Sequence, residues 1–421
     1  MGALLVKTSL RSNVTLLILL TVCWLAGCVK DAAHQSSNPP SDLPSPSSTD
    51  TAYAASPAGI TPDLLQQSWQ VYRQRFIQTD GRVIDREAND RSISEGQAYA
   101  LLRAVMIDDR ETFDQVLQWS ETNLQRRNPD GSRADSLWAW KWGKQPNGNW
   151  GTIDNNFASD GDIDAINALI WAAQRWNHSP YLDLARQKLK DLWNLSTLPA
   201  NGSRYLLPGP RAAFQPQPNQ AYLNPSYFAP YAFRLFAQID SSRDWLSLVD
   251  SSYQVLESSA QLSAVGLPSD WVMLDTQTGK VTASTANNLP SRYGFDAYRV
   301  WWRVSLDAAQ FQEPRAIQYL QRQLQPLRQQ WQTRQTIPAK IDLQGKPLVD
   351  YESTSQYAML YPAFQVTDPD VARAIYQQKL LPTYRDGFWD NDSAYYVQNL
   401  TWLGLFPTNT LPTDWFRATA F

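Results

Sequence analysis

Apolar side chains recur every three to four residues along most of the chain, which is the spacing of an amphipathic helix. In residues 62–78, for example, Leu65, Trp69, Tyr72 and Phe76 fall on one helix face. The same period predicts about twelve helices, over 62–78, 94–107, 111–126, 162–176, 180–194, 225–239, 243–258, 292–304, 307–330, 353–364, 368–380 and 391–405. The chain is therefore predicted to be all-α.

Three stretches interrupt the helical pattern, and each is rich in Gly, Asn, Asp and Thr. They cover 130–157, 265–290 and 334–351, where short hairpins are predicted. No repeat of fixed length is visible, which argues against a tetratricopeptide or ankyrin array. Paired helices with short loops fit a solenoid or a closed α/α ring. We expect the ring, although periodicity alone does not distinguish the two.

The N-terminal segment has the features of an export signal. Lys7 and Arg11 precede an apolar run over Val14–Ala26, which is too short to span a bilayer comfortably but suits a secretory signal peptide. The run ends in Leu-Ala-Gly-Cys, which resembles a bacterial lipobox, so we expect residues 1–27 to be removed and Cys28 to be lipidated. Ordinary signal-peptide cleavage beside an incidental Cys is the alternative.

The rest of the chain divides into a tether and one predicted domain. Residues 28–60 are rich in Ser, Pro, Asp and Ala, which predicts a disordered tether. Residues 61–421 contain no Pro/Gly/Ser-rich break, so we expect a single domain there. We also expect the protein to be a monomer. These features predict an exported protein that is lipid-anchored to a bacterial membrane, in the periplasm or at the cell surface.

Composition narrows the chemistry. The only two His are His34 and His178, and neither has Cys or His neighbours at metal-ligand spacing, which argues against zinc sites and Ser–His–Asp triads. The net charge is −3 and no basic run is present, which argues against a nucleic acid partner. Trp outnumbers Met by 18 to 4, and indole rings stack on pyranose C–H faces. Carboxylate chemistry on a sugar is therefore favoured.

Glu95 closes the segment Ser92-Ile93-Ser94-Glu95, which fits a capping box with Ser92 as the N-cap. A catalytic acid is the alternative interpretation. A helix N-terminus favours an ionised carboxylate, so an acid at this position needs an apolar pocket or a second carboxylate to raise its pKa. Tyr99, one turn further on, supplies an aromatic wall.

Asp160 starts a run of acids at a predicted helix start, because Asp162 and Asp164 follow it. An N-cap role explains Asp160 but not the other two acids. Their spacing superficially resembles a calcium loop of the EF-hand type. The sixth and twelfth positions of that loop would be Ala165 and Trp171 in place of Gly and Glu, so a metal site is disfavoured.

Asp296 lies in the aromatic and basic stretch 292–303. A simple i,i+3 ion pair with Arg299 would explain it. The alternative is a catalytic base that Arg299 holds beside a sugar-stacking wall. Trp140 lies within an alternating run of Trp; we expect most Trp to fill the core and a few to line a cleft.

The sequence as a whole resembles glycoside hydrolase family 8, which includes bacterial endoglucanases such as those that accompany cellulose synthase. The matching segments occur in the family's order: SEGQAYALLRAV, LWAWKW, NNFASDGDIDA, NPSYFAPYAFRLFA, RYGFDAYRVWWR, YESTSQYA and the Tyr395-Tyr396 pair. The resemblance implies an (α/α)6 barrel, with small irregular or hairpin insertions, that hydrolyses β-1,4 glycans with inversion and without a cofactor.

The resemblance also implies roles for single residues. Glu95 matches the family's general acid, Asp296 its general base, and Asp160 the carboxylate that holds the sugar at the cleavage point. Inversion requires room for a water, so the carboxyls of Glu95 and Asp296 are expected ~6.5–9.5 Å apart. Further residues resemble substrate-binding positions: Tyr99, Trp140, Tyr227, Arg299 and Tyr396.

We therefore expect an endoglucanase that acts on cellulose or a related β-glucan, with a cellulose synthesis or export complex as a candidate partner. The same mechanism on xylan, mixed-linkage glucan or chitosan stays open. A non-catalytic glycan-binding protein in polysaccharide export and an α/α-barrel polysaccharide lyase are alternatives from other classes.

Overall fold

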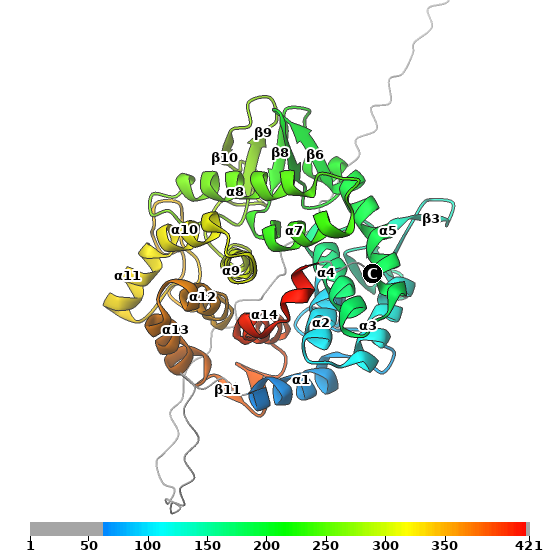
Figure 1. Cartoon of the computed structure of the whole chain (residues 1–421), viewed down its shortest axis with the longest axis horizontal. Coiled ribbons are helices and arrows are strands. Elements are labelled where there is room, and N and C mark those ends of the chain that lie inside the picture. The colour runs from blue at the N-terminus through cyan, green and yellow to red at the C-terminus, as the bar shows by residue number, and fades with distance from the viewer. Residues whose placement is uncertain (1–61, 418–421) are drawn as a thin grey trace, which may run out of the picture.

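Helices dominate the computed structural model, which describes residues 62–417 (Figure 1). Six helices form an inner layer: α2 (Ser94–Met106), α4 (Ser159–Arg175), α7 (Pro230–Ile239), α9 (Tyr298–Phe311), α12 (Thr354–Thr367) and α14 (Tyr395–Leu405). Six others pack outside them: α1 (Pro62–Phe76), α3 (Arg110–Asn123), α5 (Ser179–Ser196), α8 (Trp245–Leu262), α10 (Pro314–Gln323) and α13 (Pro369–Ile375). The short helices α6 (Arg211–Phe214) and α11 (Gln325–Arg334) complete the α-helices of this region.

The inner helices close into a ring. Each packs against the next one along the chain, and α14 returns to contact both α1 and α2. Inner and outer helices alternate in chain order, so each inner helix has an outer partner. The expected closed ring, an (α/α)6 barrel, is therefore confirmed, and a solenoid is excluded because its ends would not meet.

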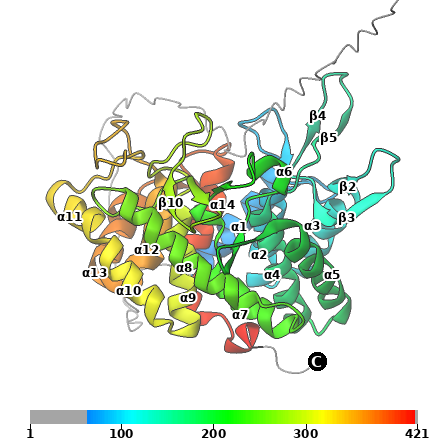
Figure 2. The same cartoon turned by 90° about the horizontal axis from the view of Figure 1, so that it is seen from above.

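Every strand of the described region lies in a connection that leads from an outer helix to the next inner helix. The strands are β1 (Ser92–Ile93), β2 (Gln125–Arg127), β3 (Arg133–Trp138), β4 (Lys141–Lys144), β5 (Trp150–Asp154), β6 (Thr197–Ala200), β7 (Ser203–Leu206), β8 (Gln220–Leu223), β9 (Val272–Asp275), β10 (Val281–Ala283), β11 (Tyr384–Arg385) and β12 (Phe388–Trp389). They form small antiparallel sheets, ordered β1-β4-β5, β10-β9-β8, β2-β3, β6-β7 and β11-β12. Figure 2 shows several of these strands projecting beyond the helices. Long connections thus gather where the inner helices begin.

The predicted helices differ from the observed ones mainly where the backbone is interrupted. The segment 307–330, predicted as one helix, contains the end of α9, then α10 and most of α11. Gln312 ends α9 with a φ of 50°, and Pro314 and Pro326 each stand in the first turn of the next helix. Proline is tolerated in a first turn but disrupts a helix interior, which explains the division.

The hairpin predictions are confirmed in two stretches out of three. Strands β3 to β5 fall within 130–157, and β9 and β10 fall within 265–290. The stretch 334–351 contains no strand and only isolated bridges, from Ile341 to Tyr293 and to Pro347. The hairpin of β6 and β7 lay outside all three stretches and was missed.

The core is continuous across both helix layers and is rich in aromatic rings. The predicted apolar face of the first helix is buried, since Leu65, Trp69, Tyr72 and Phe76 are at most 4% exposed. Most Trp side chains in residues 62–417 are buried as well, as predicted.

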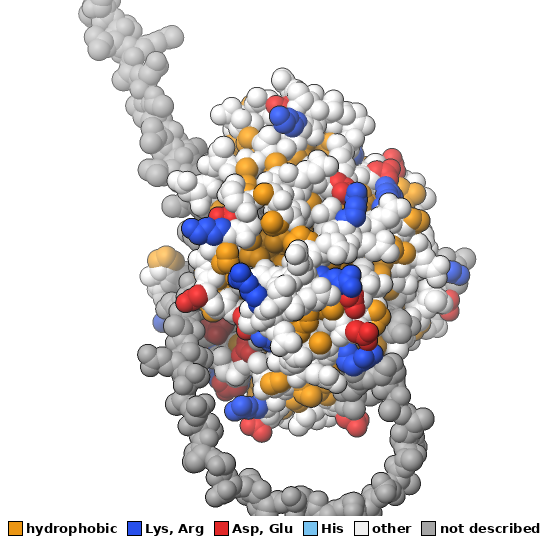
Figure 3. Space-filling model, turned by 90° about the vertical axis from the view of Figure 1, so that its left-hand side faces the viewer, with side chains coloured by type: hydrophobic (Ala, Val, Ile, Leu, Met, Phe, Trp, Pro, Cys, Tyr) orange, Lys and Arg blue, Asp and Glu red, His pale blue; other side chains and the backbone are white. Residues whose placement is uncertain are grey.

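The outer surface carries charges of both signs. On the face that Figure 3 shows, acidic and basic side chains are interspersed and apolar side chains lie between them. The ion pair between Arg328 of α11 and Asp368, the N-cap of α13, has an N–O distance of 2.8 Å and links two helices on this side. Such exposed pairs contribute about 0–1 kcal/mol each.

The predicted signal peptide (1–27), the lipidated Cys28 and the tether (28–60) lie outside the described residues. Within residues 62–417, no helix is both long enough and apolar enough to cross a bilayer.

Candidate active site

Three carboxylates from distant segments meet at one guanidinium. Arg299, the second residue of α9, donates from Nη1 to Glu95 and to Asp160 Oδ2, the latter at 2.8 Å. Its Nη2 donates to Asp296 Oδ1, also at 2.8 Å. The Arg299 and Asp160 side chains are 2% and 3% exposed, whereas those of Glu95 and Asp296 are each 15% exposed. The buried pair therefore lies beneath two carboxylates that reach solvent.

The ring explains why these residues converge. Glu95 lies in the first turn of α2, Asp160 in the first turn of α4, and Asp296 two residues before the start of α9. The contacts with Arg299 show that the three inner helices begin at the same end of the barrel. Helix N-termini carry partial positive charge, so this end favours acidic side chains.

The environment of Glu95 suits an acid. Burial raises the pKa of Glu95 to about 8; Arg299 opposes this shift, and the charge of Asp160 adds to it. Tyr99 donates its hydroxyl hydrogen to Glu95 Oε1 at 3.0 Å. Desolvation and the neighbouring acids thus outweigh the helix end, which was the condition for a general acid. Glu95 is therefore mainly protonated at neutral pH.

The predicted capping box is wrong. Helix α2 starts at Ser94, and its N-cap is Ile93, which makes no side-chain capping bond. Ser92 instead belongs to β1, where it is paired with Trp142, and its hydroxyl donates to the Val83 carbonyl at 2.6 Å. Ser92 therefore pairs in a strand, although the local sequence motif predicts that it caps the helix.

Asp296 lies opposite Glu95 across the guanidinium. The i,i+3 ion pair with Arg299 is present, as the sequence suggested. Burial raises the pKa of Asp296; Arg299 and the N–H groups of Asn224 and Trp271 oppose this, and Asp160 adds to it. Because Glu95 and Asp296 bind the two ends of one guanidinium, their nearest oxygens are at most about 7 Å apart. That limit admits both the ~5–5.5 Å separation of retaining enzymes and the shortest separations of the ~6.5–9.5 Å range of inverting enzymes.

Asp160 does not cap its helix. Helix α4 starts one residue earlier, at Ser159, and Ala158 is the N-cap. Asp160 Oδ1 accepts from the Gly161 N–H at 2.8 Å, while Oδ2 binds Arg299. The side chain is thereby fixed at both oxygens beneath the two more exposed carboxylates.

The other acids of this run have separate partners. Asp162 Oδ1 accepts from the Trp138 N–H at 3.1 Å, and Asp164 Oδ2 accepts from Arg303 Nη2 at 2.7 Å. The three acids therefore bind different parts of the molecule. Within residues 62–417, no group of three or more His, Cys, Asp or Glu is arranged to hold a metal ion.

The predicted substrate-binding aromatics lie around the carboxylates. The Tyr227 ring, just before α7, is centred 5.3 Å from Arg299 Cζ. Tyr396 at the start of α14 donates to the carbonyl of Phe295, the residue before Asp296, at 2.9 Å. Trp140 is 4% exposed, and its carbonyl accepts from the Ser94 N–H that starts α2 at 3.0 Å. The helices α7 and α14 thus also begin at the end of the barrel that holds the three carboxylates.

Sequence reasoning missed Asp270, which supports the segment that carries Asp296. Asp270 is 5% exposed and accepts from the Ala297 N–H at 2.9 Å, while its own N–H donates to the Arg292 carbonyl at 2.6 Å. Burial raises the pKa of Asp270 to about 7, and the charge of Asp296 adds to this. Asp270 lies in a stretch without helical periodicity, and the residues next to it form no recognisable motif, so the sequence did not indicate a functional role.

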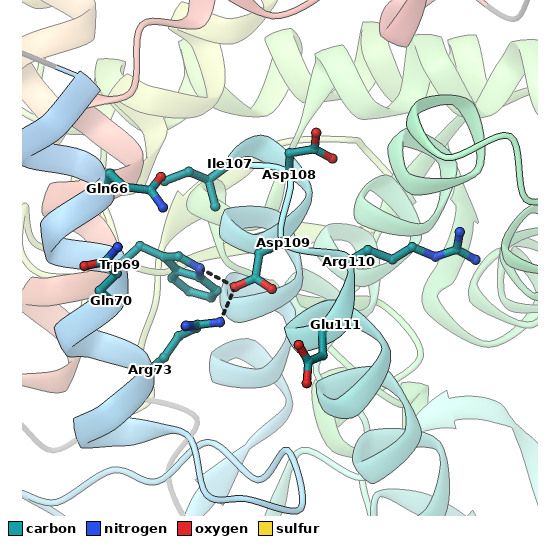
Figure 4. A pocket seen from close by; sticks show the side chains of 9 residues that line it. All are labelled: Gln66, Trp69, Gln70, Arg73, Ile107, Asp108, Asp109, Arg110 and Glu111. Carbon is teal, nitrogen blue, oxygen red and sulfur yellow. Dashed lines mark hydrogen bonds and ion pairs between the residues drawn. The ribbon is translucent and has the colours of Figure 1, made fainter.

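A separate cavity lies at the other end of α2. It has a volume of about 350 Å³ and is lined by Gln66, Trp69, Gln70, Arg73, Ile107, Asp108, Asp109, Arg110 and Glu111 (Figure 4). Within it, Asp109 Oδ2 accepts from Trp69 Nε1 at 2.8 Å and from Arg73 Nη1 at 2.7 Å. About 18 Å of helix separates Ile107 from Glu95, so this cavity does not belong to the carboxylate site.

Known proteins resemble this chain in sequence and in fold. Residues 47–410 match Glycosyl hydrolases family 8. An endoglucanase of Xanthomonas axonopodis pv. citri (strain 306) is 35% identical over 256 residues, which cover 60% of this chain and 63% of that protein. An endoglucanase of Escherichia coli (strain K12) is 30% identical over 345 residues, covering 80% and 85%. The crystal structure of endo-1,4-D-glucanase from Vibrio fischeri ES114 has a TM-score of 0.66 at 25% identity, covering 80% and 93%.

Proposed function

We propose that this chain, which belongs to glycosyl hydrolases family 8, is an endo-β-1,4-glucanase that cleaves cellulose or a related β-glucan with inversion. The observation that carries this proposal is the meeting of Glu95, Asp160 and Asp296 at Arg299. The similarity to endoglucanases over most of the chain supports the substrate class.

Glu95 is the proposed general acid. Its raised pKa keeps the proton in place at neutral pH, and its partial exposure lets it reach a glycosidic oxygen. Transfer of that proton to the oxygen assists departure of the leaving sugar as the glycosidic bond breaks.

Asp296 is the proposed general base. It removes a proton from a water that attacks the anomeric carbon from the face opposite the leaving group, which inverts the configuration. Arg299 and the N–H groups of Asn224 and Trp271 favour the ionised form of Asp296 that this step needs.

Asp160 is the proposed anchor for the sugar at the cleavage point. Its carboxylate is held by Arg299 and by the Gly161 N–H, so its position is fixed before substrate binds. A fixed carboxylate can accept hydrogen bonds from ring hydroxyls and stabilise the positive charge that develops on the ring.

Reducing-end release from carboxymethyl cellulose tests this proposal. Glu95→Gln should lower kcat by about 100- to 10,000-fold, because the amide cannot supply the proton. Glu111→Gln serves as the matched control, since Glu111 lies at the other end of α2 from the site. No release by the wild type from cellulose, mixed-linkage glucan, xylan or chitosan, together with tight oligosaccharide binding, would favour a glycan-binding protein instead. Unsaturated products that absorb ultraviolet light would indicate a lyase.

We further propose that lipid on Cys28 holds the enzyme at a bacterial membrane, where a cellulose synthesis or export complex would supply the glucan. The support is the lipobox-like sequence ending in Cys28 and the Ser/Pro-rich segment after it. Cys28→Ser should move the protein from the membrane fraction to the soluble fraction. Equal membrane partition of the two forms would contradict the anchor.

A further inference from the structure

Trp150 stands out among the tryptophans of residues 62–417 because its side chain alone is exposed, at 48%. It begins β5, in the hairpin with β4 that projects beyond the helices in Figure 2. An exposed indole of this size presents a flat apolar face to water, which marks a candidate contact for a ligand.

The ring of Trp150 is held rigidly. It stacks on Trp142 with ring centroids 5.5 Å apart and planes 23° apart, and Trp119 packs its edge against Trp142. The Arg82 guanidinium lies 4.6 Å from the Trp142 centroid and 4.4 Å from that of Trp150. Arg82 is itself 6% exposed, and its Nε donates to Ser92 Oγ at 2.9 Å. The pair formed by Trp142 and Trp150 is therefore a preorganised platform, which is exposed to solvent at Trp150.

The platform is continuous with the carboxylate site. Trp150 is paired with Lys144, Trp142 is paired with Ser92, and the Trp140 carbonyl accepts from the Ser94 N–H, next to Glu95. The path from Trp150 to Glu95 thus follows an extended strand for about five residues, or roughly 15 Å. Cellohexaose or a longer glucan bound at the cleavage point can reach Trp150, whereas a disaccharide cannot occupy both places.

We propose that the Trp142–Trp150 platform binds a segment of the β-1,4-glucan several sugar units away from the bond that is cleaved, and so favours long chains over short ones. This inference rests on the proposed function. The equatorial substituents of a β-1,4-linked glucan leave apolar C–H faces on both sides of each ring, and such faces stack on indole. A second contact on the same chain raises affinity through effective concentration, without new contacts at the cleavage point.

Kinetics on long and short substrates test the platform. Trp150→Ala should lower kcat/KM on carboxymethyl cellulose roughly 5- to 10-fold more than on the shortest cello-oligosaccharide that the wild type cleaves. Trp150→Phe should restore most of this difference, because it retains an aromatic face. Leu246→Ala is the matched control, since Leu246 is a 50% exposed apolar side chain on α8. Equal losses on long and short substrates would overturn the proposal.

Binding separates this inference from the proposed function. In the Glu95→Gln background, titration with cellohexaose should quench tryptophan fluorescence, and Trp150→Ala should weaken the measured affinity roughly 5-fold or more. This affinity measurement tests glucan binding at the platform even if the wild type cleaves no glycan. Unchanged cellohexaose affinity, or a change in sedimentation showing that Trp150 joins two copies of the chain, would overturn it.

Discussion

At the scale of single residues, the site contains more acidic groups than basic ones. One guanidinium, Arg299, binds three carboxylates, so full ionisation would leave two uncompensated negative charges in a largely buried place. Low polarity strengthens that repulsion, and the group that relieves it at least cost keeps a proton. Glu95 is that group, with a pKa raised to about 8. The ion pairs with Arg299 therefore do more than hold the three segments together, because they also help to set the protonation of Glu95.

This imbalance predicts the pH dependence of catalysis. A general acid works only while protonated, so with Glu95 as the proposed acid kcat/KM should hold below its pKa and fall as the pH rises through about 8. On the acidic side, activity should fall as Asp296 gains a proton, at a pH above the ordinary range of Asp because burial raises its pKa. The measurement is kcat/KM against pH on carboxymethyl cellulose.

An activated substrate supplies the control for the pH profile. With an aryl cello-oligoside, whose leaving group needs little protonation, Glu95→Gln should retain activity but lose the alkaline fall. An alkaline fall that persists in Glu95→Gln would show that another group, not Glu95, is the acid.

Asp270 is predicted to position the base. It accepts from the Ala297 N–H directly after Asp296, so Asp270→Ala, which removes this acceptor, should displace Asp296 and lower kcat about 10- to 100-fold. Asp270→Asn keeps an acceptor oxygen and should retain most of the wild-type kcat. Burial raises the pKa of Asp270 to about 7, so this carboxyl is largely neutral where Asp296 titrates, and the acidic fall of kcat/KM should stay at the wild-type pH in both variants. Asp183→Asn is the control, because Asp183 is exposed on α5. Full kcat in Asp270→Ala, or an equal loss in Asp270→Asn and Asp270→Ala, would contradict positioning through this hydrogen bond.

At the scale of elements, the site depends on how closely α2 and α4 approach. A Cβ on Gly161 would lie 2.8 Å from Ser94 Oγ and 2.9 Å from the Glu95 backbone nitrogen. Both contacts are shorter than real Cβ atoms show, so any side chain at this position must push the start of α2 away. Gly161 therefore sets the distance between the acid and Asp160.

Substitutions at two glycines distinguish a loss of stability from a displacement of the site residues. Gly161→Ala should cost about 1–3 kcal/mol of unfolding free energy and also lower kcat, because Glu95 moves. Gly404→Ala should reduce stability in the same direction, since its Cβ would lie 2.1 Å from the Ala358 carbonyl oxygen at the crossing of α12 and α14. The measurements are urea unfolding and kcat; a Gly161→Ala enzyme with full kcat would contradict this account.

Periodicity predicted most elements because a buried helix face leaves a clear pattern, and it failed where local and tertiary signals compete. Pro314 and Pro326 divide one predicted helix into parts, although both were visible in the sequence. Ser92 has the local signature of a cap, but its backbone pairs with Trp142, about 50 residues further on. Such distant pairing cannot be inferred from the residues around Ser92.

At the scale of the whole molecule, ring closure creates the site. Arg299 meets Glu95 and Asp160 only because α9, α4 and α2 begin at one end of a closed ring. Periodicity predicts the helices but not which ends meet, so the family resemblance was needed to bring the three acidic motifs together. Asp270 was missed because its role depends on this closure and not on its sequence neighbours.

The same closure separates the two ends of the barrel. Long connections with strands gather where the inner helices begin, whereas the opposite connections are short, such as residues 107–109 between α2 and α3. Short connections hold the helix pairs together, and the long ones carry exposed residues such as Trp150. The proposed catalytic residues therefore lie at the end of the barrel that has the long connections.

The stereochemistry of the first product tests the central claim, which is that Glu95 and Asp296 act on opposite faces of one glycosidic bond. Proton NMR of a cello-oligosaccharide digest, recorded before mutarotation equilibrates the anomers, reports the configuration of each new reducing end. Attack by a water that Asp296 activates predicts that α-anomers appear first. New reducing ends that appear first as β-anomers would contradict the account, because retention requires a covalent intermediate on one of the carboxylates.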